Sequence, residues 1–552
     1  MDSLFKELEE LLAGSVIRDN AVRKQYSHDA SIYEITPELV IEPQNTTDIK
    51  RLIKFVSKYK QSYPSLALTP RGAGTDMSGA AIGHSLLLDM TKHFNTISNV
   101  TSKEIHLQPG VFLHDLDPIL ANKGLFLGSV PASRALNTIG GMVGNNSGGE
   151  QSLRYGNTER WVRQLKVVLA DGNEYTIKPL SKYELGQKMK QTDFEGRLYT
   201  NIYNLIEKNY DLIKNARPKV NKNSMGYNLW SVWDRKTEIF DLTHLITGSQ
   251  GTLGIITDIW MEPIPSAKHS GLLIAYLTKT ADLAKIIPIV SEHNPSTFEG
   301  FDDVTFNLGL KHFKNFRKRL GAKEWAKQQM TLVGSAAKFK GHLPNLVLMI
   351  EFEADTYSEL NDKLIAMQND VLKANRRIKT EIEGTEEMSR AFWTIRRASL
   401  SLLREQIKDK YAAPFIDDLT VQPRYVPEFL PKIRRIIRKY KLPVTISGHF
   451  GDGNFHLVPL VDITSQTDRA KLEPILRELI PIVKSYGGTL AGEHNDGMIR
   501  GPWLPAVFGD EVYQLFKHTK ELFDPLYIFN PHKKTDASLE YSNDHVRSSN
   551  SL

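Results

Sequence analysis

The stretch Arg71-Gly-Ala-Gly-Thr-Asp-Met-Ser-Gly79 follows the apolar run Ser65-Leu-Ala-Leu-Thr69, and Pro70 separates the two. The run predicts a buried strand that proline and glycine end. Small residues after a strand expose consecutive backbone N–H groups, which is the geometry that cradles a pyrophosphate. The stretch lacks the Lys-Ser/Thr of a P-loop, and Met77 stands where the Rossmann pattern needs its third glycine. Taken alone, such a stretch is more often a tight turn between strands.

Two further glycine-rich segments follow along the chain. Residues 138–149 hold five glycines and two asparagines within twelve positions. So many glycines raise the entropic cost of folding. Two explanations are equally good: a close approach of the main chain to a large flat ligand, or a set of structural turns. Residues 247–255, Thr-Gly-Ser-Gln-Gly-Thr-Leu-Gly-Ile, repeat the theme.

The segments around these glycines alternate between strand and helix patterns. Residues 38–42 predict a strand, and Asn45 then opens a helix with one apolar face. Residues 85–89 and 104–108 predict further strands, and residues 165–177 predict a hairpin that turns at Asp171-Gly172. Pro263-Ile-Pro265 marks a domain boundary.

A second region begins near residue 270. Its strand candidates, 272–276 and 346–351, are separated by helical patterns, which predicts an antiparallel sheet with helices on one face. Residues 427–440 predict an amphipathic helix. The basic run 311–319 could touch an anionic membrane or a redox partner, but such a run is more often a solvated helix face.

Composition excludes several classes of protein. The length of 552 residues suggests three or four lobes, for which two large domains with appendages are a natural arrangement. A content of 41% hydrophobic and 24% charged residues is typical of a folded globular protein. A net charge of +6 without a long basic block argues against nucleic-acid binding. The chain has no cysteine, which excludes disulfides, thiol nucleophiles and Cys-ligated clusters. Any redox centre is therefore a bound cofactor or a metal held by histidines and carboxylates.

The strongest chemical signal lies late in the chain, in Gly448-His449-Phe-Gly-Asp-Gly-Asn-Phe-His456. Strand-like residues 443–446 and 457–460 flank it, so a turn around Gly451-Asp-Gly453 can bring His449 and His456 together. Residues 492–497, Gly-Glu-His-Asn-Asp-Gly, add a carboxylate and a third imidazole. Two histidines and one carboxylate are a usual ligand set for a divalent metal, although a single histidine is more often a hydrogen-bonded loop residue.

In their order and spacing, the three glycine-rich segments resemble the FAD-binding domain of the vanillyl-alcohol oxidase type. This PCMH-type domain is also known from para-cresol methylhydroxylase. The chain is similar to the branch with the glycolate oxidase subunit, D-lactate dehydrogenase and D-2-hydroxyglutarate dehydrogenase, from about Ile41 to Lys534. The resemblance implies an α+β fold with a bipartite FAD-binding PCMH-type domain and an antiparallel-sheet-and-helix substrate (cap) domain. The expected parts are an N-terminal helical segment (1–34), the FAD domain (35–267), the substrate domain (268–505), a segment returning to the flavin (506–534) and a disordered tail (535–552).

The resemblance also implies roles for individual residues. The first glycine segment would wrap the FAD pyrophosphate, the second would line the rest of the cofactor, and the third would contact its adenosine side. Because the pyrophosphate loop has no histidine or cysteine, we expect the FAD to be non-covalent. The implied cofactor-binding residues are Pro70, Arg71, Gly72, Ala73, Gly74, Thr75, Asp76, Ser78, Pro131, Ser133, Thr138, Gly140, Gly141, Asn145, Ser147, Gly148, Gly251, Gly254, Ile255, Ile256 and Asn530.

The family's histidine motifs bind a zinc or manganese ion beside the flavin or supply the base. Carried over, His449, His456 and Glu493 become metal ligands and His494 becomes the general base. Asn454 becomes a substrate contact, and the Trp-x-x-Arg segment that ends at Arg396 becomes the clamp for a substrate carboxylate.

Four residues depart from the family pattern. Asp76 puts a negative charge into the pyrophosphate loop, Gln250 stands where glutamate is common, and Asn495 and His532 each replace a glycine. These departures put the substrate in doubt more than they do FAD binding.

The resemblance implies oxidation of a D-2-hydroxy acid to the 2-oxo acid, with hydride passing to the flavin. The expected electron acceptor is a quinone, a cytochrome or an electron-transfer flavoprotein. We expect a cytoplasmic protein, since no signal peptide or spanning segment is visible, and we allow for peripheral contact with the inner membrane and for a homodimer. Three alternatives stay open: a redox-neutral or polyol-oxidising flavoprotein, a flavin-binding subunit of a larger complex, and a metallohydrolase without flavin.

Overall fold

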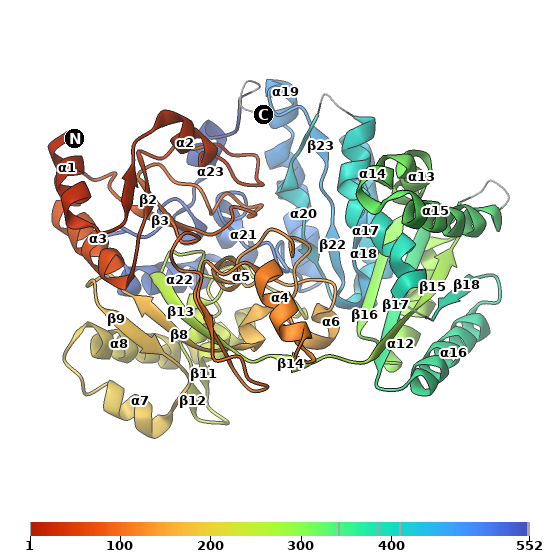
Figure 1. Ribbon diagram of the computed structural model, residues 1–552, viewed down its shortest axis with the longest axis horizontal. Helices are drawn as coiled ribbons and strands as arrows, with labels where there is room; N and C mark the ends of the chain where they lie inside the picture. Colours follow the sequence, from red (N-terminus) through yellow and green to blue (C-terminus); the bar gives the residue numbers. More distant parts are fainter. Residues whose placement is uncertain (1, 340–342, 385, 408–409, 549–552) are drawn as a thin grey trace.

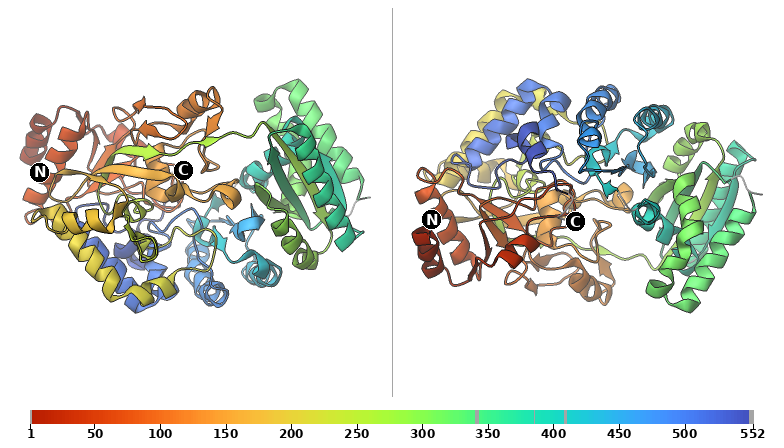
Figure 2. Two further views of the ribbon diagram at one scale, coloured as in Figure 1. Left: turned by 90° about the horizontal axis from the view of Figure 1, so that it is seen from below. Right: turned by 90° about the horizontal axis from the view of Figure 1, so that it is seen from above.

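The computed structural model describes residues 2–339, 343–384, 386–407 and 410–548. Two lobes lie side by side along the longest axis (Figures 1 and 2). The first 265 residues form one lobe, and the green segment that begins near residue 270 forms most of the other. The blue C-terminal segment runs back from the second lobe onto the first.

The first sheet of the N-terminal lobe has four strands in the order β1, β2, β4, β3. Its members are β1 (Ser15–Ile17), β2 (Leu39–Glu42), β4 (Leu86–Asp89) and β3 (Leu68–Arg71). Helix α3 (Thr46–Tyr59) begins where predicted, because the Asn45 side chain accepts a hydrogen bond from the Asp48 amide. Its apolar face packs with Leu4 and Leu8 of α1 (Asp2–Leu11). The N-terminal segment is thus part of this lobe, and β1 extends its sheet.

The second sheet has five antiparallel strands in the order β5, β6, β13, β8, β9. These are β5 (Ile97–Ser98), β6 (Ile105–Leu107), β13 (Ile255–Met261), β8 (Val162–Val168) and β9 (Glu174–Ile177). The predicted hairpin is confirmed, with Leu165 opposite Ile177. The lobe also contains α2 (Asn20–Gln25), α4 (Leu113–Ala121), β7 (Leu125–Phe126), α5 (Ile139–Asn145), α6 (Ser152–Tyr155), β10 (Leu180–Ser181), α7 (Lys182–Lys188), α8 (Phe194–Lys208), α9 (Tyr210–Ala216), α10 (Leu229–Val232), β11 (Trp233–Asp234), β12 (Ile239–Phe240), α11 (Thr243–Ile246) and β14 (Ile264–Pro265).

The second lobe is built on a seven-stranded antiparallel sheet in the order β18, β15, β17, β16, β21, β22, β20. The strands are β18 (Lys379–Glu383), β15 (His269–Leu277), β17 (Leu346–Ala354), β16 (Thr297–Asp302), β21 (Ser447–His449), β22 (Asn454–His456) and β20 (Leu419–Thr420). The helices around it are α12 (Leu283–Glu292), α13 (Asp303–His312), α14 (Arg317–Leu320), α15 (Ala322–Ala337), α16 (Tyr357–Ala374), α17 (Glu386–Gln406) and α18 (Val426–Lys439). The strand predicted at 443–446 is absent, since β21 begins at Ser447.

Helices cover both faces of this sheet, so the prediction of helices on one face is wrong (Figure 1). Along β15, Leu273 and its alternate neighbours belong to the core that includes α12 and α16. Leu272 and Ile274 point the other way, into a core with α13 and α17. Strand side chains alternate between faces, and here both sets are apolar, which marks a sheet buried on both sides.

The basic run on α13 and α14 turns its apolar side inward. Phe313 and Phe316 are buried against the sheet, and Leu320 packs on the same core. The apolar side chains of the run are therefore part of the core, and contact of its basic side chains with an anionic membrane or a redox partner stays a prediction. Among the helices that the structure describes, none is long and apolar enough to cross a bilayer.

The chain crosses back to the first lobe earlier than residue 506. The amide of Lys219 already donates to the carbonyl of Gly487, and Phe516 of α22 (Asp510–Phe523) lies in the core of the N-terminal lobe. Leu68 of β3 then forms a parallel bridge with Phe529. The remaining elements are β19 (Tyr411–Ala412), β23 (Leu460–Val461), α19 (Gln466–Arg469), α20 (Leu472–Ser485), α21 (Leu504–Phe508) and α23 (Leu539–Asp544).

The tail is folded at least to residue 548, so the prediction of disorder from residue 535 is wrong there; residues 549–552 lie outside the described part of the chain. Ser538 caps α23, and Ser542 donates to the carbonyl of Met498. Arg547 is buried and donates to the carbonyls of Tyr33 and Asp29. These hydrogen bonds, together with Leu539, Tyr541 and Val546, which pack against the core of the second lobe, hold the tail in place.

We expect Arg547→Ala to lower the free energy of unfolding by about 1–3 kcal/mol, because it leaves two carbonyls without their donor. Urea denaturation followed by tryptophan fluorescence measures the loss. Lys182→Ala is the control, since Lys182 is exposed and pairs only with the equally exposed Glu238. Equal midpoints for both variants would contradict the contacts assigned to the tail.

Candidate functional site

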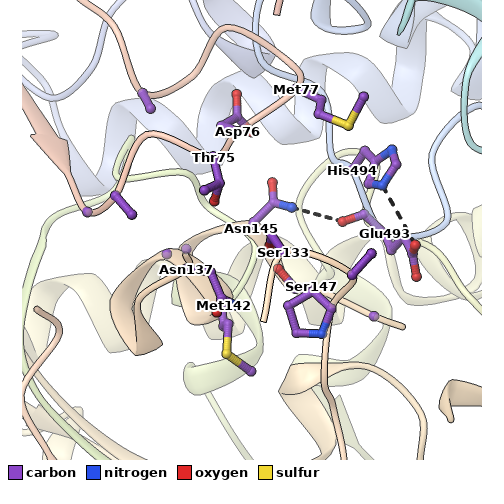
Figure 3. Close-up of a pocket in the computed structure, with 18 of the residues that line it drawn as sticks. Thr75, Asp76, Met77, Ser133, Asn137, Met142, Asn145, Ser147, Glu493 and His494 are labelled. Atoms are coloured by element: carbon purple, nitrogen blue, oxygen red, sulfur yellow. Dashed lines mark hydrogen bonds and ion pairs between the residues drawn. The ribbon is translucent and has the colours of Figure 1, made fainter. Parts of the chain in front are cut away.

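One cavity of about 340 Å³ is bordered by all three glycine-rich segments and by the histidine motifs. Figure 3 shows Thr75 to Met77 and the α5 segment on one side, with Glu493 and His494 facing them. The predicted site residues that line the cavity are Pro70, Arg71, Gly72, Ala73, Gly74, Thr75, Asp76, Pro131, Ser133, Thr138, Gly140, Gly141, Asn145, Ser147, Gly148, Gly251, Gly254, Ile256, Arg396, His449, His456, Glu493 and His494.

The glycine segments pack directly on one another. A Cβ at Gly72 would lie 2.1 Å from the hydroxyl oxygen of Thr138, so only glycine lets the first segment reach the second. Gly251 has φ +68, and a Cβ there would lie 2.3 Å from Cγ of Pro70. The predicted convergence of the three segments is therefore present, and glycine is needed for it at these two positions.

The charged side chains of the first loop, Arg71 and Asp76, hydrogen-bond to protein groups in and around the loop. The Arg71 guanidinium donates to the carbonyls of His28, at 3.0 Å, and Ala81, at 3.1 Å. The Asp76 carboxylate accepts from the amide and hydroxyl of Ser78 and from the amide of Ala80. Local donors thus offset the negative charge that Asp76 brings to the loop.

Gln250 joins three parts of the cavity wall. Its amide nitrogen donates to the hydroxyl of Ser78 at 2.9 Å and to Oδ1 of Asn145 at 3.3 Å. Its amide oxygen accepts from the Gly497 amide at 2.8 Å. A glutamate could accept from Gly497 but could not donate to the other two, which explains why an amide suits this chain.

The two residues that replace family glycines keep the left-handed backbone and add contacts. Asn495 has φ 60, and its side chain donates to the carbonyls of Asn145 and Gly248. His532 has φ 63 and stacks on Tyr541 with ring centroids 3.9 Å apart. Both side chains recover, through packing or hydrogen bonds, part of the cost of a strained backbone.

Four predicted site residues lie behind the cavity wall and do not line it: Ser78, Ile255, Asn454 and Asn530. Asn530 donates to the carbonyls of Ala80 and Gln250, so it ties the C-terminal segment to two of the glycine segments. Asn454 is fully buried and donates to Oδ1 of Asp418 at 2.8 Å. In this structure these side chains support the wall.

The turn around Gly451–Gly453 brings the two histidines together as predicted, but the strands beside it are 447–449 and 454–456, which hold the histidines themselves, and not the predicted 443–446 and 457–460. Strands β21 and β22 pair across the Gly451–Gly453 turn, which brings Nε2 of His449 within 3.0 Å of Nε2 of His456. Oε1 of Glu493 lies 3.2 Å from the first nitrogen and 3.3 Å from the second. A tetrahedral ion with bonds of about 2.0–2.1 Å separates its ligand atoms by about 3.3 Å, so these three atoms fit one face of such a site.

Buried carboxylates orient both imidazoles. Glu299 of β16, which is fully buried, contacts Nδ1 of His449, and Asp417 contacts Nδ1 of His456 at 3.3 Å. Because both Nδ1 atoms face carboxylates, both Nε2 atoms face Glu493. The two Nε2 atoms and Oε1 of Glu493 are then three hydrogen-bond acceptors in contact, and a cation or a proton between them is needed to offset their repulsion. Burial opposes charge on His449, but Glu299 outweighs it and raises the pKa of His449 to about 9.

The third histidine is held in the same way. Oδ2 of Asp417 lies 2.6 Å from Nδ1 of His494, which leaves Nε2 toward the cavity, 3.7 Å from Glu493. Burial opposes its charged form, but the carboxylates of Asp418 and Asp417 raise the pKa of His494 to about 9. A divalent cation beside Glu493 would be a like charge and would lower that pKa again.

Arginines from α17 border the opposite side of the cluster. Arg396 is buried, and Oε2 of Glu299 accepts from its Nε at 2.8 Å and its Nη2 at 2.7 Å. Glu299 therefore holds both a predicted metal ligand and the predicted carboxylate clamp. Arg397 pairs with Glu150 of the N-terminal lobe through two hydrogen bonds, at 2.8 and 2.7 Å, which join the lobes at the cavity.

Sequence reasoning missed Glu299, Asp417 and Lys222. Lys222 is fully buried, and its ammonium lies 3.1 Å from Oε2 of Glu493 and 3.4 Å from Oδ2 of Asp452. Burial opposes this charge, but Glu493 and Asp452 raise the pKa of Lys222. The available signals were a glutamate between Phe298 and Gly300 in a strand and an Asp-Asp pair between Ile416 and Leu419. No sequence pattern indicated a role for Lys222.

The fold and the cavity together define a two-domain protein built to hold a large cofactor beside a histidine–carboxylate cluster. Comparison with known proteins makes this specific: a model for the FAD binding domain matches residues 37–178, and one for the C-terminal domain of FAD linked oxidases matches residues 267–534. The chain thus contains an FAD binding domain followed by the C-terminal domain of FAD linked oxidases.

Two curated relatives and one solved structure illustrate the similarity. A D-2-hydroxyglutarate dehydrogenase of Pseudomonas putida is 27% identical over 94% of this chain and 50% of its own length. The glycolate oxidase subunit GlcD of Bacillus subtilis is 28% identical over 93% of this chain and 92% of its own length. The 4-ethylphenol oxidase of Gulosibacter chungangensis is 14% identical, with a TM-score of 0.68 over 98% of both chains. This chain thus spans about half the length of the first relative and nearly all of the second.

Proposed function

We propose that this protein oxidises a D-2-hydroxy acid to the 2-oxo acid with a non-covalent FAD. The observation that carries the proposal is the single cavity that combines backbone-lined walls for the cofactor with His449, His456, Glu493 and His494. The names of the relatives, D-2-hydroxyglutarate dehydrogenase and glycolate oxidase subunit, support the substrate class.

The three glycine segments would hold the FAD. When bound there, the FAD would supply the acceptor for the hydride from C2 of the substrate. The wall contributed by α5 contacts the histidine loop directly, because Asn145 donates to the carbonyl of Glu493 at 2.9 Å (Figure 3). This contact fixes the distance between the cofactor wall and the cluster that handles the substrate.

His449, His456 and Glu493 would hold a zinc or manganese ion. When bound there, the ion would lower the pKa of the substrate hydroxyl and help to orient the substrate. The donor set supports this assignment, because three acceptor atoms converge with the spacing of ligands and each imidazole is oriented by a carboxylate.

The remaining side chains would bind the substrate and move its proton. Arg396 presents a buried positive charge to the substrate carboxylate. His494, with Nδ1 bound to Asp417, offers Nε2 to the hydroxyl proton as a general base. Lys222 balances the charge of Glu493 from the side away from the histidines.

The reduced cofactor needs an electron acceptor. The chain has no cysteine and so carries no iron–sulfur cluster ligated by cysteine. We propose a quinone, a cytochrome or an electron-transfer flavoprotein as the acceptor.

The purified protein, mixed anaerobically with D- and L-2-hydroxy acids and with polyols, tests the proposal. We expect heat to release FAD and the D-2-hydroxy acids alone to bleach the bound flavin. Bleaching by polyols only would replace the proposed substrate class, and a colourless protein that takes up no FAD would overturn the proposal.

A further inference from the structure

Asp417 lies between two histidines to which different roles are proposed. It is fully buried at the end of the short segment that follows β19, and its carboxylate is shared: Oδ1 lies 3.3 Å from Nδ1 of His456, and Oδ2 lies 2.6 Å from Nδ1 of His494. The rings of the two histidines are stacked with centroids 5.1 Å apart. One carboxylate therefore contacts both imidazoles on the side away from Glu493.

The position of Asp417 is fixed by contacts of its own. The amide of Leu457 donates to Oδ1 at 3.2 Å, and the buried guanidinium of Arg500 donates to the Asp417 carbonyl at 3.0 Å. Arg500 also donates to the carbonyls of Pro414 and Asn495. The carboxylate thus has little freedom to turn, and the histidines must adapt to it.

A carboxylate accepts hydrogen bonds and does not donate them, so each Nδ1 must carry the proton. A neutral imidazole has one N–H only, and Nε2 of both rings then keeps its lone pair. His456 needs that lone pair to bind a metal, and His494 needs it to accept a proton. Asp417 therefore leaves the lone pair on Nε2 of both His456 and His494.

We infer that Asp417 is a positioning residue that sets the tautomers of His456 and His494 together, and so prepares the metal ligand and the general base at once. The inference rests on the proposed function, because it takes the roles of the two histidines from there. It adds that the base and the metal site are coupled through one buried carboxylate, which acts through the two histidines.

Asp417, His456 and His494 could instead be ligands of a second ion, since their donor atoms lie within 4.8 Å of one another. The 2.6 Å between Asp417 and His494 is shorter than the separation of about 3.3 Å between ligands on one tetrahedral ion and matches a charge-assisted hydrogen bond. The number of ions bound per chain separates the two interpretations.

The experiment compares Asp417→Asn with the wild-type holoprotein. Zinc and manganese affinities are measured by competition with a chelator, and the rate of anaerobic flavin reduction by a D-2-hydroxy acid is measured at saturating metal. An asparagine can accept from only one of the two histidines, so we expect the metal affinity to fall about 10–100-fold and the rate at saturating metal to fall as well, with FAD content unchanged.

Two further variants sharpen the result. His494→Gln should lower the rate and leave metal affinity unchanged, because His494 is not among the proposed ligands. Asp302→Asn is the matched control: Asp302 is buried and accepts backbone hydrogen bonds on β16, outside the cavity, so metal affinity should not change. If Asp417→Asn does not fold, Asp417→Ala supplies the test, with metal affinity restored by added formate, which a purely structural role would not predict.

Several outcomes overturn the inference. They are an Asp417→Asn variant with wild-type metal affinity, two ions bound per wild-type chain, and no restoration by formate in a folded Asp417→Ala variant. A wild-type protein that binds no ion but whose flavin is reduced by hydroxy acids would end the inference and leave the redox part of the proposed function in place. A protein that binds one ion and no FAD would overturn the redox part of the proposed function and leave the inference about Asp417 and the metal site in place.

Discussion

Glu299→Gln is expected to lower kcat/KM for a 2-hydroxy acid by about 10–100-fold, because the glutamine amide can keep only one of the two contacts that Glu299 makes with His449 and Arg396. Glu299 is fully buried and ionised, since burial opposes its charge but His449 and Arg396 hold the pKa of Glu299 below its ordinary value. A glutamine has one acceptor and one donor. If its oxygen accepts from Arg396, its nitrogen donates to His449 and forces the proton of that ring onto Nε2, toward the metal position.

In the opposite orientation, the amide oxygen still accepts the hydrogen bond from His449, but an N–H group of the amide faces the Arg396 guanidinium. Steady-state kinetics and metal content distinguish the two orientations, and both lower kcat/KM. Glu381→Gln is the matched control, because Glu381 lies on β18 of the same sheet and pairs with Lys338 outside the cavity. Activity within twofold of wild type for Glu299→Gln would show that the buried charge does not organise the site.

Glu493→Gln is the second large expected effect. It removes the carboxylate charge from the three-atom face and leaves Lys222 with Asp452 alone. We expect divalent-ion affinity to fall by more than about 100-fold, and flavin reduction to fall by a factor on the order of 10³, which corresponds to several kcal/mol of lost charge stabilisation. FAD should stay bound, because the glycine-lined walls are unchanged.

Chelation gives an internal check on this variant. Wild-type protein treated with a chelator should resemble Glu493→Gln, and the variant itself should respond no further to the chelator. Retention of a tightly bound ion in Glu493→Gln, or a further loss of its activity on chelation, contradicts the assignment of Glu493 as a ligand.

The parts of the site that the sequence predicted are those whose chemistry is local. Glycines next to a strand limit the backbone wherever they occur, and the His449 hairpin brings its two imidazoles together within eight residues of chain. Asp417, Glu299 and Lys222 reach the same histidines and carboxylate from positions 39, 150 and 271 residues away. No spacing rule connects such distant residues, and only the folded sheet places them together.

The wrong fold predictions have similar causes. Period-two alternation in β15 shows that side chains point to two faces, but both faces are apolar here, and the pattern alone did not show that each was covered. The polar composition of the tail predicts disorder, whereas Arg547 and Ser542 hold it in place through hydrogen bonds to carbonyls, which composition does not reveal.

The central claim is that one cavity brings a metal-held hydroxy acid to the flavin. Stopped-flow measurement of anaerobic flavin reduction, with a D-2-hydroxy acid carrying hydrogen or deuterium at C2 and with and without chelator, tests it most directly. The account predicts rapid bleaching, a slower rate with deuterium, and loss of the reaction on chelation. Flavin that stays oxidised with every D-2-hydroxy acid, or that is reduced equally fast after the metal has been removed, would contradict it.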